Sequence, residues 1–159
     1  MSNAEHMIAV FERDHWVVCQ QANGLSHEDS LLQPPFRCNC FNWVLGHIVG
    51  GRDLVLAALG APPVLSEEEL VVYQRESEPL TDAERAVPLE KLLAALDETQ
   101  FRLVNALKET SLETLAAVRN EERQQTLGDY ITFLQWHETY HLGQLEILRQ
   151  LAGTDDKII

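Results

Sequence analysis

The sequence predicts an all-α protein, a four-helix bundle with a long crossover connection between the second and third helices. Apolar residues recur at spacings of three and four in four long stretches, as they do on helices that share a core. No stretch of any length alternates apolar and polar residues in the manner of a half-buried strand. The polar, acidic segment 66–87 separates the second stretch from the third, and its length argues against a simple up-down-up-down order.

Clear stop signals bound the first two helices. Residues 6–22 have apolar side chains on a helical period, and the Asn-Gly pair that follows is typical of a helix C-terminus. A segment with two adjacent prolines then interrupts the helical pattern up to residue 40. The second helix is expected from about residue 41 to just before Gly60, with the apolar residues Trp43, Val44, Leu45, Ile48, Val49, Leu54, Val55 and Leu59.

The crossover and the third helix follow. Ser66 and Glu69 have the spacing of a capping box, which predicts a short helix at the start of the crossover, and Pro79 would end it. The third helix is expected over residues 89–107, where leucines recur at helical spacing.

The fourth helix is expected over residues 126–152, after a turn within residues 111–118. Thr126 and Asp129 have the spacing of its N-cap and N3 residues. The apolar face predicted for this helix comprises Tyr130, Phe133, Leu134, His137, His141, Leu145, Leu148 and Ala152.

Length and composition restrict the class of protein. The 159 residues suit one domain, 1–159, and 45% hydrophobic residues are enough for a core. A net charge of −13 repels phosphate backbones and anionic membranes, so no nucleic acid and no membrane partner is expected. No apolar run reaches membrane-spanning length, no secretory signal is evident, and three cysteines show no paired framework. A cytoplasmic protein is therefore expected.

His137 and His141 have the spacing of metal ligands. Residues four apart on a helix lie on one face, where two imidazoles can reach one cation at about 2.0–2.1 Å. Two buried histidines without partners would each cost about 1–3 kcal/mol, and a ligand role removes that cost. The alternative is a pair of core histidines that bind other side chains or carbonyls.

A catalytic site of this kind needs a third protein ligand, and His47 is the best candidate. It lies within the apolar pattern of the second helix, one turn after Trp43. Gly46, Gly50 and Gly51 surround it, at a cost of about 0.5–1 kcal/mol each relative to alanine, and would leave room near a cofactor. The alternative explanation of the glycines is close packing between helices.

The remaining histidines and cysteines are weaker candidates. His6 and His15 belong to the first helix and would reach the core only if that face turns inward, while His27 lies in a polar loop and is expected to be exposed. Cys38 and Cys40 could bind a soft metal, but a C-x-C pair without a companion pair is weak evidence. We interpret both cysteines as ordinary loop residues.

His137-Glu138-x-x-His141 also matches the H-E-x-x-H pattern of zinc metalloproteases, in which the glutamate activates water. Only eighteen residues follow His141, and they lack the downstream ligand of such proteases, which argues against that function. Glu138 is then a residue that supports a ligand, a general base, or a solvated side chain.

The chain resembles the DinB-like superfamily over essentially its whole length. The residues that carry the resemblance are Asn42-Trp43-Val44-Leu45-Gly46-His47 and Trp136-His137-Glu138-Thr139-Tyr140-His141-Leu142-Gly143-Gln144. The resemblance implies a four-helix bundle in which His47, His137 and His141 bind a divalent metal, with zinc or nickel favoured and iron also suited. Some members are dimers, so the resemblance also allows a homodimer.

The family resemblance implies a reaction only loosely. The better understood members are thiol-dependent transferases and isomerases, which use low-molecular-weight thiols such as bacillithiol or mycothiol. We therefore expect an enzyme that transfers a small thiol to an electrophilic substrate, with Glu138 or Gln144 orienting water or substrate. A metal-activated hydrolase is the first alternative, because a bound metal lowers the pKa of water or a thiol. A non-catalytic bundle that binds metal or a small molecule, or a purely structural domain, remains open.

Overall fold

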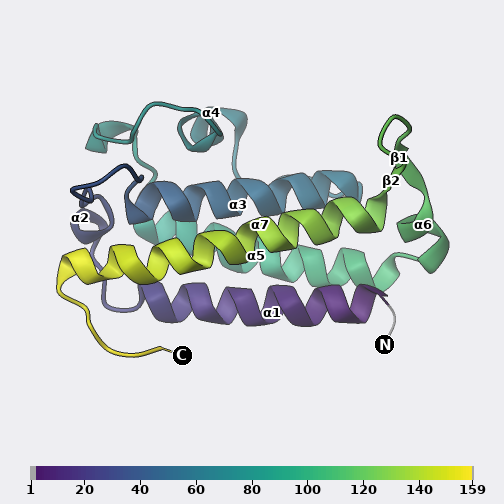
Figure 1. Cartoon of the computed structure of the whole chain (residues 1–159), viewed down its shortest axis with the longest axis horizontal. Coiled ribbons are helices and arrows are strands. Elements are labelled where there is room, and N and C mark those ends of the chain that lie inside the picture. The colour runs from purple at the N-terminus through teal and green to yellow at the C-terminus, as the bar shows by residue number, and fades with distance from the viewer. Residues whose placement is uncertain (1–2, 159) are drawn as a thin grey trace.

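The computed structural model describes residues 3–158. The protein is the all-α bundle that the sequence predicts (Figure 1). Four long helices form the bundle: α1 (Asn3–Ala22), α3 (Phe41–Ala58), α5 (Leu89–Glu109) and α7 (Leu127–Leu148). All four begin or end within a few residues of the predicted limits. None of the helices in residues 3–158 is long and apolar enough to cross a membrane.

The bundle has an up-down-down-up order. Helices α1 and α7 run in one direction, and α3 and α5 run in the other (Figure 1). Each of α3 and α1 packs against both α5 and α7, so α1 and α3 are diagonal to one another. Because α3 and α5 are parallel, the chain must return along the length of the bundle between them, which explains the long crossover over residues 59–88.

Short elements make up the connections. The first connection contains α2 (His27–Ser30), and the crossover contains α4 (Glu67–Leu70), η1 (Val71–Tyr73) and η2 (Ala83–Arg85). Between α5 and α7 lie α6 (Leu112–Ala116) and a two-stranded antiparallel hairpin, β1 (Val118–Asn120) and β2 (Gln125–Thr126), and η3 (Arg149–Ala152) follows α7. The hairpin was not predicted, because its strands are too short to show alternation.

The predicted helix starts are confirmed by their caps. Ser66 with Glu69 forms a complete capping box at α4, and Thr126 with Asp129 forms another at α7. In each, the hydroxyl accepts from the N3 backbone amide while the N3 carboxylate accepts from the N-cap amide. The short helix of the crossover ends at η1, several residues before Pro79, which is earlier than predicted.

A polar layer divides the apolar core in two. One cluster packs the start of α3 and α5 against the end of α1 and α7, and the other packs the opposite ends of these helices. Between them, the buried Arg52 of α3 donates to both carboxylate oxygens of Glu138 on α7, over 2.6–3.1 Å. Arg52 also donates to Gln100 on α5 and to the Phe11 carbonyl on α1. One guanidinium thus joins all four long helices.

The buried face of α7 agrees with the predicted face at Leu134, His141, Leu145 and Leu148 and differs elsewhere. The buried residues, most of them at alternating spacings of four and three, are Leu127, Ile131, Leu134, Gln135, Glu138, His141, Leu142, Leu145 and Leu148. Phe133, predicted to be buried, is 50% exposed, and His137 lies at the edge of the core. The residue that points into the core beside His137 is therefore Glu138.

Candidate metal centre

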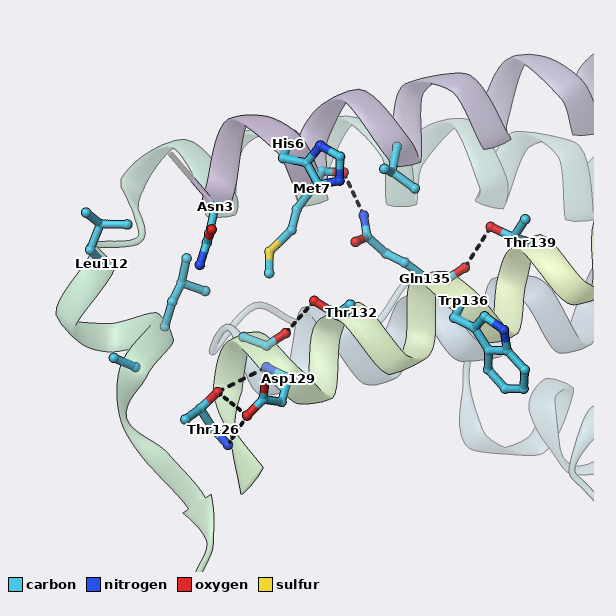
Figure 2. A pocket seen from close by; sticks show the side chains of 14 residues that line it. Asn3, His6, Met7, Leu112, Thr126, Asp129, Thr132, Gln135, Trp136 and Thr139 are labelled. Carbon is cyan, nitrogen blue, oxygen red and sulfur yellow. Dashed lines mark hydrogen bonds between the residues drawn. The ribbon is translucent and has the colours of Figure 1, made fainter. Parts of the chain in front are cut away.

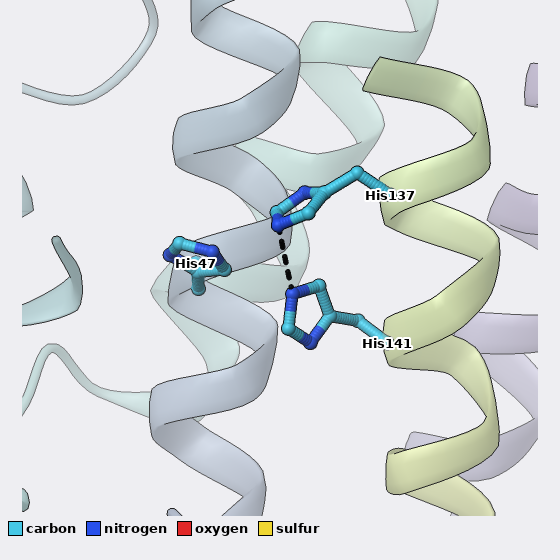
Figure 3. Close-up of side chains that lie close together, drawn as sticks. All are labelled: His47, His137 and His141. Carbon is cyan, nitrogen blue, oxygen red and sulfur yellow. Dashed lines mark hydrogen bonds between the residues drawn. The ribbon is translucent and has the colours of Figure 1, made fainter. Parts of the chain in front are cut away.

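The structure brings His47, His137 and His141 together (Figure 3). One ring nitrogen from each lies within 4.8 Å of the others, and the Nε2 atoms of His137 and His141 are 3.1 Å apart. His47 comes from α3, while the other two are one turn apart on α7. About 3.3 Å separates two nitrogens bound to one tetrahedral ion at about 2.0–2.1 Å, so the spacing suits a single small cation.

The crossover fixes the orientation of His47. Its Nδ1–H donates to the backbone carbonyl of Tyr73 in η1 over 2.6 Å, which leaves Nε2 as the free acceptor. The Trp43 indole stacks on the imidazole, with 4.8 Å between ring centroids. Histidines that bind metals commonly donate their second N–H to a carbonyl or carboxylate, and His47 has this arrangement.

The residues before His47 hold the crossover against α3. Trp43 Nε1 donates to the Val72 carbonyl over 2.8 Å, and the Tyr73 hydroxyl donates to Asn42 Oδ1 over 2.9 Å. Gly46 faces the Tyr73 ring, where an added Cβ would lie 2.4 Å from a ring carbon. Each part of the Asn42-Trp43-x-x-Gly46-His47 motif thus contributes to placing the carbonyl that His47 uses.

The glycines near His47 serve packing more than cofactor space. Gly46 admits the Tyr73 ring, and Gly50 lies against Leu70 of the crossover, with 3.3 Å to an added Cβ. Gly51 faces open space. The close-packing interpretation is therefore the better one, with a crossover segment rather than a neighbouring helix as the partner.

His141 has a side-chain partner of the same kind. Its Nδ1 lies 2.6 Å from Oε1 of Gln144, and with the amide oxygen as acceptor this bond leaves Nε2 unprotonated and directed at His137. Gln144 was expected to orient water or substrate. In the structure its side chain orients the imidazole of His141.

Burial keeps the three histidines neutral. It lowers the pKa of His47 below the ordinary value for histidine and lowers the pKa of His141 to about 4. The pKa of His137 is lowered first by burial and then by the neighbouring His47 and Arg75. Neutral imidazole is the form that binds metal, so the site is ready for a cation at neutral pH.

A broad pocket of about 1000 Å³ opens beside the triad. Its wall includes aromatic rings that are more than half exposed, from Phe36, Trp136 and Tyr140. Arg37 and Arg75 contribute positive charge to its wall, and Glu76, whose carboxylate lies 3.9 Å from Arg75, contributes a negative charge. All three histidines, Gln144 and the half-buried Cys38 line the same pocket, so a bound cation would face a space that admits a small molecule.

Glu138 is not part of this pocket. Both of its oxygens accept from Arg52 in the core, and the side chain is 5% exposed. The expectation that it orients water or substrate is thus corrected, because the helix turns Glu138 about 100° away from His137. Sequence reasoning also missed its partner Arg52, although a charged residue inside the apolar pattern of α3 was a usable signal.

The other candidates lie elsewhere. His6 is exposed at the start of α1, and His15 does not reach the triad but lies beside Asp97 of α5. His27, expected to be exposed, is half-buried, and its Nδ1 accepts from the Leu89 amide at the start of α5. Cys40 is fully buried at the start of α3, where burial raises the pKa of its thiol.

A second pocket, of about 530 Å³, lies between the first turns of α1 and α7 and helix α6 (Figure 2). Several of its polar groups bind within the chain: Thr126 and Asp129 cap α7, Thr132 donates to the Gly128 carbonyl, and Gln135 donates to the Met7 carbonyl. These bonds serve helix structure, so the pocket beside the triad is the better candidate site.

Comparisons with known proteins agree with this fold. A crystal structure of a conserved protein from Enterococcus faecalis has the same fold, with a TM-score of 0.76 and 16% sequence identity, over 97% of this chain and 99% of that one. No curated protein matches the sequence. The DinB superfamily matches residues 11–145, which include all three histidines. The chain therefore belongs to the DinB superfamily.

Proposed function

We propose that the protein is a metal-dependent enzyme that transfers a small thiol to a small electrophile. The observation that carries the proposal is the convergence of His47, His137 and His141 within 4.8 Å at the wall of an open pocket. A purely structural site would have no need of a pocket of about 1000 Å³ beside its ligands. Three protein ligands also leave a coordination position for substrate, as catalytic sites require.

The donor set fits a divalent transition metal. Three neutral imidazoles suit zinc or nickel, and iron also accepts such ligands. Two of the rings have their Nδ1 atoms fixed by Tyr73 and Gln144, which fits a site whose ligands are oriented before the ion binds. When bound, such a cation lowers the pKa of a coordinated water or thiol and so supplies a nucleophile at neutral pH.

The pocket residues suit a small thiol and an electrophile. Arg37 and Arg75 outnumber Glu76 on the pocket wall, so they would attract a thiol that carries a carboxylate, against the repulsion of the acidic surface. The rings of Trp136 and Tyr140 offer an apolar face to the electrophile. Gln144 uses its carbonyl oxygen on His141, so its amide N–H groups can donate to a bound substrate. A homodimer stays a prediction.

Metal analysis of untagged protein tests whether the triad binds a metal ion. We expect about one metal ion bound by the triad in the wild type, lost in the His137→Ala/His141→Ala variant and retained in His6→Ala, which changes an exposed histidine. A folded wild type whose zinc or nickel content is the same with and without the triad would overturn the proposal.

Turnover assays test whether the protein transfers a thiol to an electrophile. Wild type loaded with metal should consume a small thiol in the presence of an electrophile, and the double variant should not. A metal-activated hydrolase would use the same ligands, so the products separate the two: a thioether supports transfer, whereas hydrolysis of the electrophile without thiol consumption supports the alternative. If the metal-loaded protein has neither activity, the enzyme proposal is overturned in favour of a non-catalytic metal-binding protein.

A further inference from the structure

A second group of metal-ligand side chains lies between α1 and α5. His15 and Cys19 are one turn apart on α1, and Asp97 faces them from α5. One ligand atom from each lies within 4.8 Å of the others. The histidine triad uses α3 and α7 instead, and its pocket is not lined by any of these three residues. The two groups are therefore separate.

We propose that His15, Cys19 and Asp97 form a second divalent-metal site, of the kind that binds zinc, which joins α1 to α5. The Nε2 atom of His15 lies 3.7 Å from Cys19 Sγ and 2.7 Å from Asp97 Oδ1. Bond lengths of about 2.0–2.3 Å at tetrahedral angles place ligand atoms about 3.3–3.6 Å apart. Small rotations of the two partly exposed side chains, His15 and Asp97, would give all three contacts to one ion.

The geometry distinguishes a metal site from a catalytic cysteine. In a Cys-His-Asp arrangement for catalysis, the imidazole contacts the thiol with one nitrogen and the carboxylate with the other. Here the same Nε2 atom faces both partners, so all three ligand atoms point at one place. Burial and the Asp97 carboxylate also raise the pKa of the Cys19 thiol, which disfavours a reactive thiolate when no cation is bound.

Charge balance and access both fit a divalent cation. A neutral imidazole, a thiolate and a carboxylate carry two negative charges in total, equal to the charge of the ion. The proton of the thiol leaves to solvent as the ion binds. The Asp97 side chain is 68% exposed, so the ion has a route in and water can occupy a remaining position. The sulfur donor favours zinc over magnesium or calcium.

Cobalt(II) binding tests the site by its spectrum. A thiolate ligand gives a charge-transfer absorption that a site with only imidazole ligands lacks. In the His137→Ala/His141→Ala background, which disables the triad, we expect one cobalt ion per chain with this absorption. Adding Cys19→Ser should abolish it, and adding Cys38→Ser, which changes a half-buried cysteine outside the group, should leave it unchanged.

Asp97→Asn provides a second variant in case Cys19→Ser disturbs folding. The residue is exposed and the substitution keeps its shape, so the helical circular dichroism should be unchanged. Cobalt affinity should fall at least about tenfold, the lower bound for losing even a residue that only supports a ligand. The proposal is overturned if the triad-deficient protein binds no cobalt, if the absorption survives Cys19→Ser, or if Asp97→Asn binds as tightly as its parent.

Discussion

The ion pair between Arg52 and Glu138 and the histidine triad differ in how their polar atoms are satisfied. They use adjacent residues of α7, since Glu138 follows His137 directly. Both oxygens of Glu138 accept from Arg52, whose three nitrogens all donate within the bundle. In the triad, His47 and His141 each have Nδ1 fixed, while the nitrogens that remain converge beside a pocket.

The difference separates a structural polar group from a binding one. A buried charge pair with all its hydrogen bonds made has nothing left to offer a ligand, and its loss is felt as instability. In the triad, the Nε2 atoms of His137 and His141 form a hydrogen bond of 3.1 Å to one another beside an open pocket, and a bound ion would replace that bond. A rotation of about 100° along one helix is enough to place neighbouring residues in these two roles.

Glu138→Ala should give the largest effect. It leaves the Arg52 guanidinium buried without its charge partner, so the free energy of unfolding should fall by about 3–5 kcal/mol in urea denaturation. Glu12→Ala, an exposed position on α1, is the control and should change stability by less than about 0.5 kcal/mol. Equal stability of the two variants would mean that the ion pair is not structural.

Gly46→Ala should lower both the stability of the protein and the metal affinity of the triad. The new methyl would lie 2.4 Å from the Tyr73 ring, and displacing that ring should cost about 1–3 kcal/mol and weaken metal binding through His47. Gly51→Ala, where an added Cβ meets nothing within 4 Å, should instead stabilise α3 by about 0.5–1 kcal/mol. Thermal unfolding measures the stability, and a metal titration measures the affinity. If Gly46→Ala behaves like Gly51→Ala, Gly46 is not needed to admit the Tyr73 ring.

Gln144→Ala should affect the triad alone. Loss of the acceptor for His141 Nδ1 should weaken metal binding about 10–100-fold in competition with a chelator. The free energy of unfolding of the metal-free protein should change little, in contrast to Glu138→Ala. Gln20→Ala on the exposed side of α1 is the control, and an equal affinity for metal in both variants would show that Gln144 does not position His141.

The double variant Arg52→Met/Glu138→Leu should show the smallest net effect. Replacing a buried ion pair by apolar residues of similar volume is often neutral or stabilising, so the free energy of unfolding should return to within about 1 kcal/mol of the wild type or exceed it. Urea denaturation of the double variant and of Glu138→Ala, side by side, measures how much free energy of unfolding is recovered. Failure to recover would show that the other bonds of Arg52, to Gln100 and the Phe11 carbonyl, matter more than the charge pair.

The sequence predicted the bundle, its helix limits and the residues of the triad, because periodicity and capping residues are local signals. On α7 it assigned the exposed Phe133 to the buried face and left out the buried Glu138, because an apolar side chain is expected in a core and a carboxylate is not. The contact of Tyr73 with His47 was beyond reach, because a crossover without periodicity gives no sign of where it packs. The group of His15, Cys19 and Asp97 needed the pairing of α1 with α5, which the order of helices alone does not give.

The crossover has a consequence for how this site can diversify. It lies outside the four long helices, yet its Tyr73 carbonyl orients His47 and its residues Arg75, Glu76 and Ser77 line the pocket (Figure 1). Substitutions at Arg75 and Glu76 would therefore reshape the pocket, whereas Leu80 and Val87 later in the same crossover belong to the core and have to keep their packing. Redesign of the pocket in this scaffold should begin with Arg75 and Glu76, as loop grafting does on other rigid frameworks.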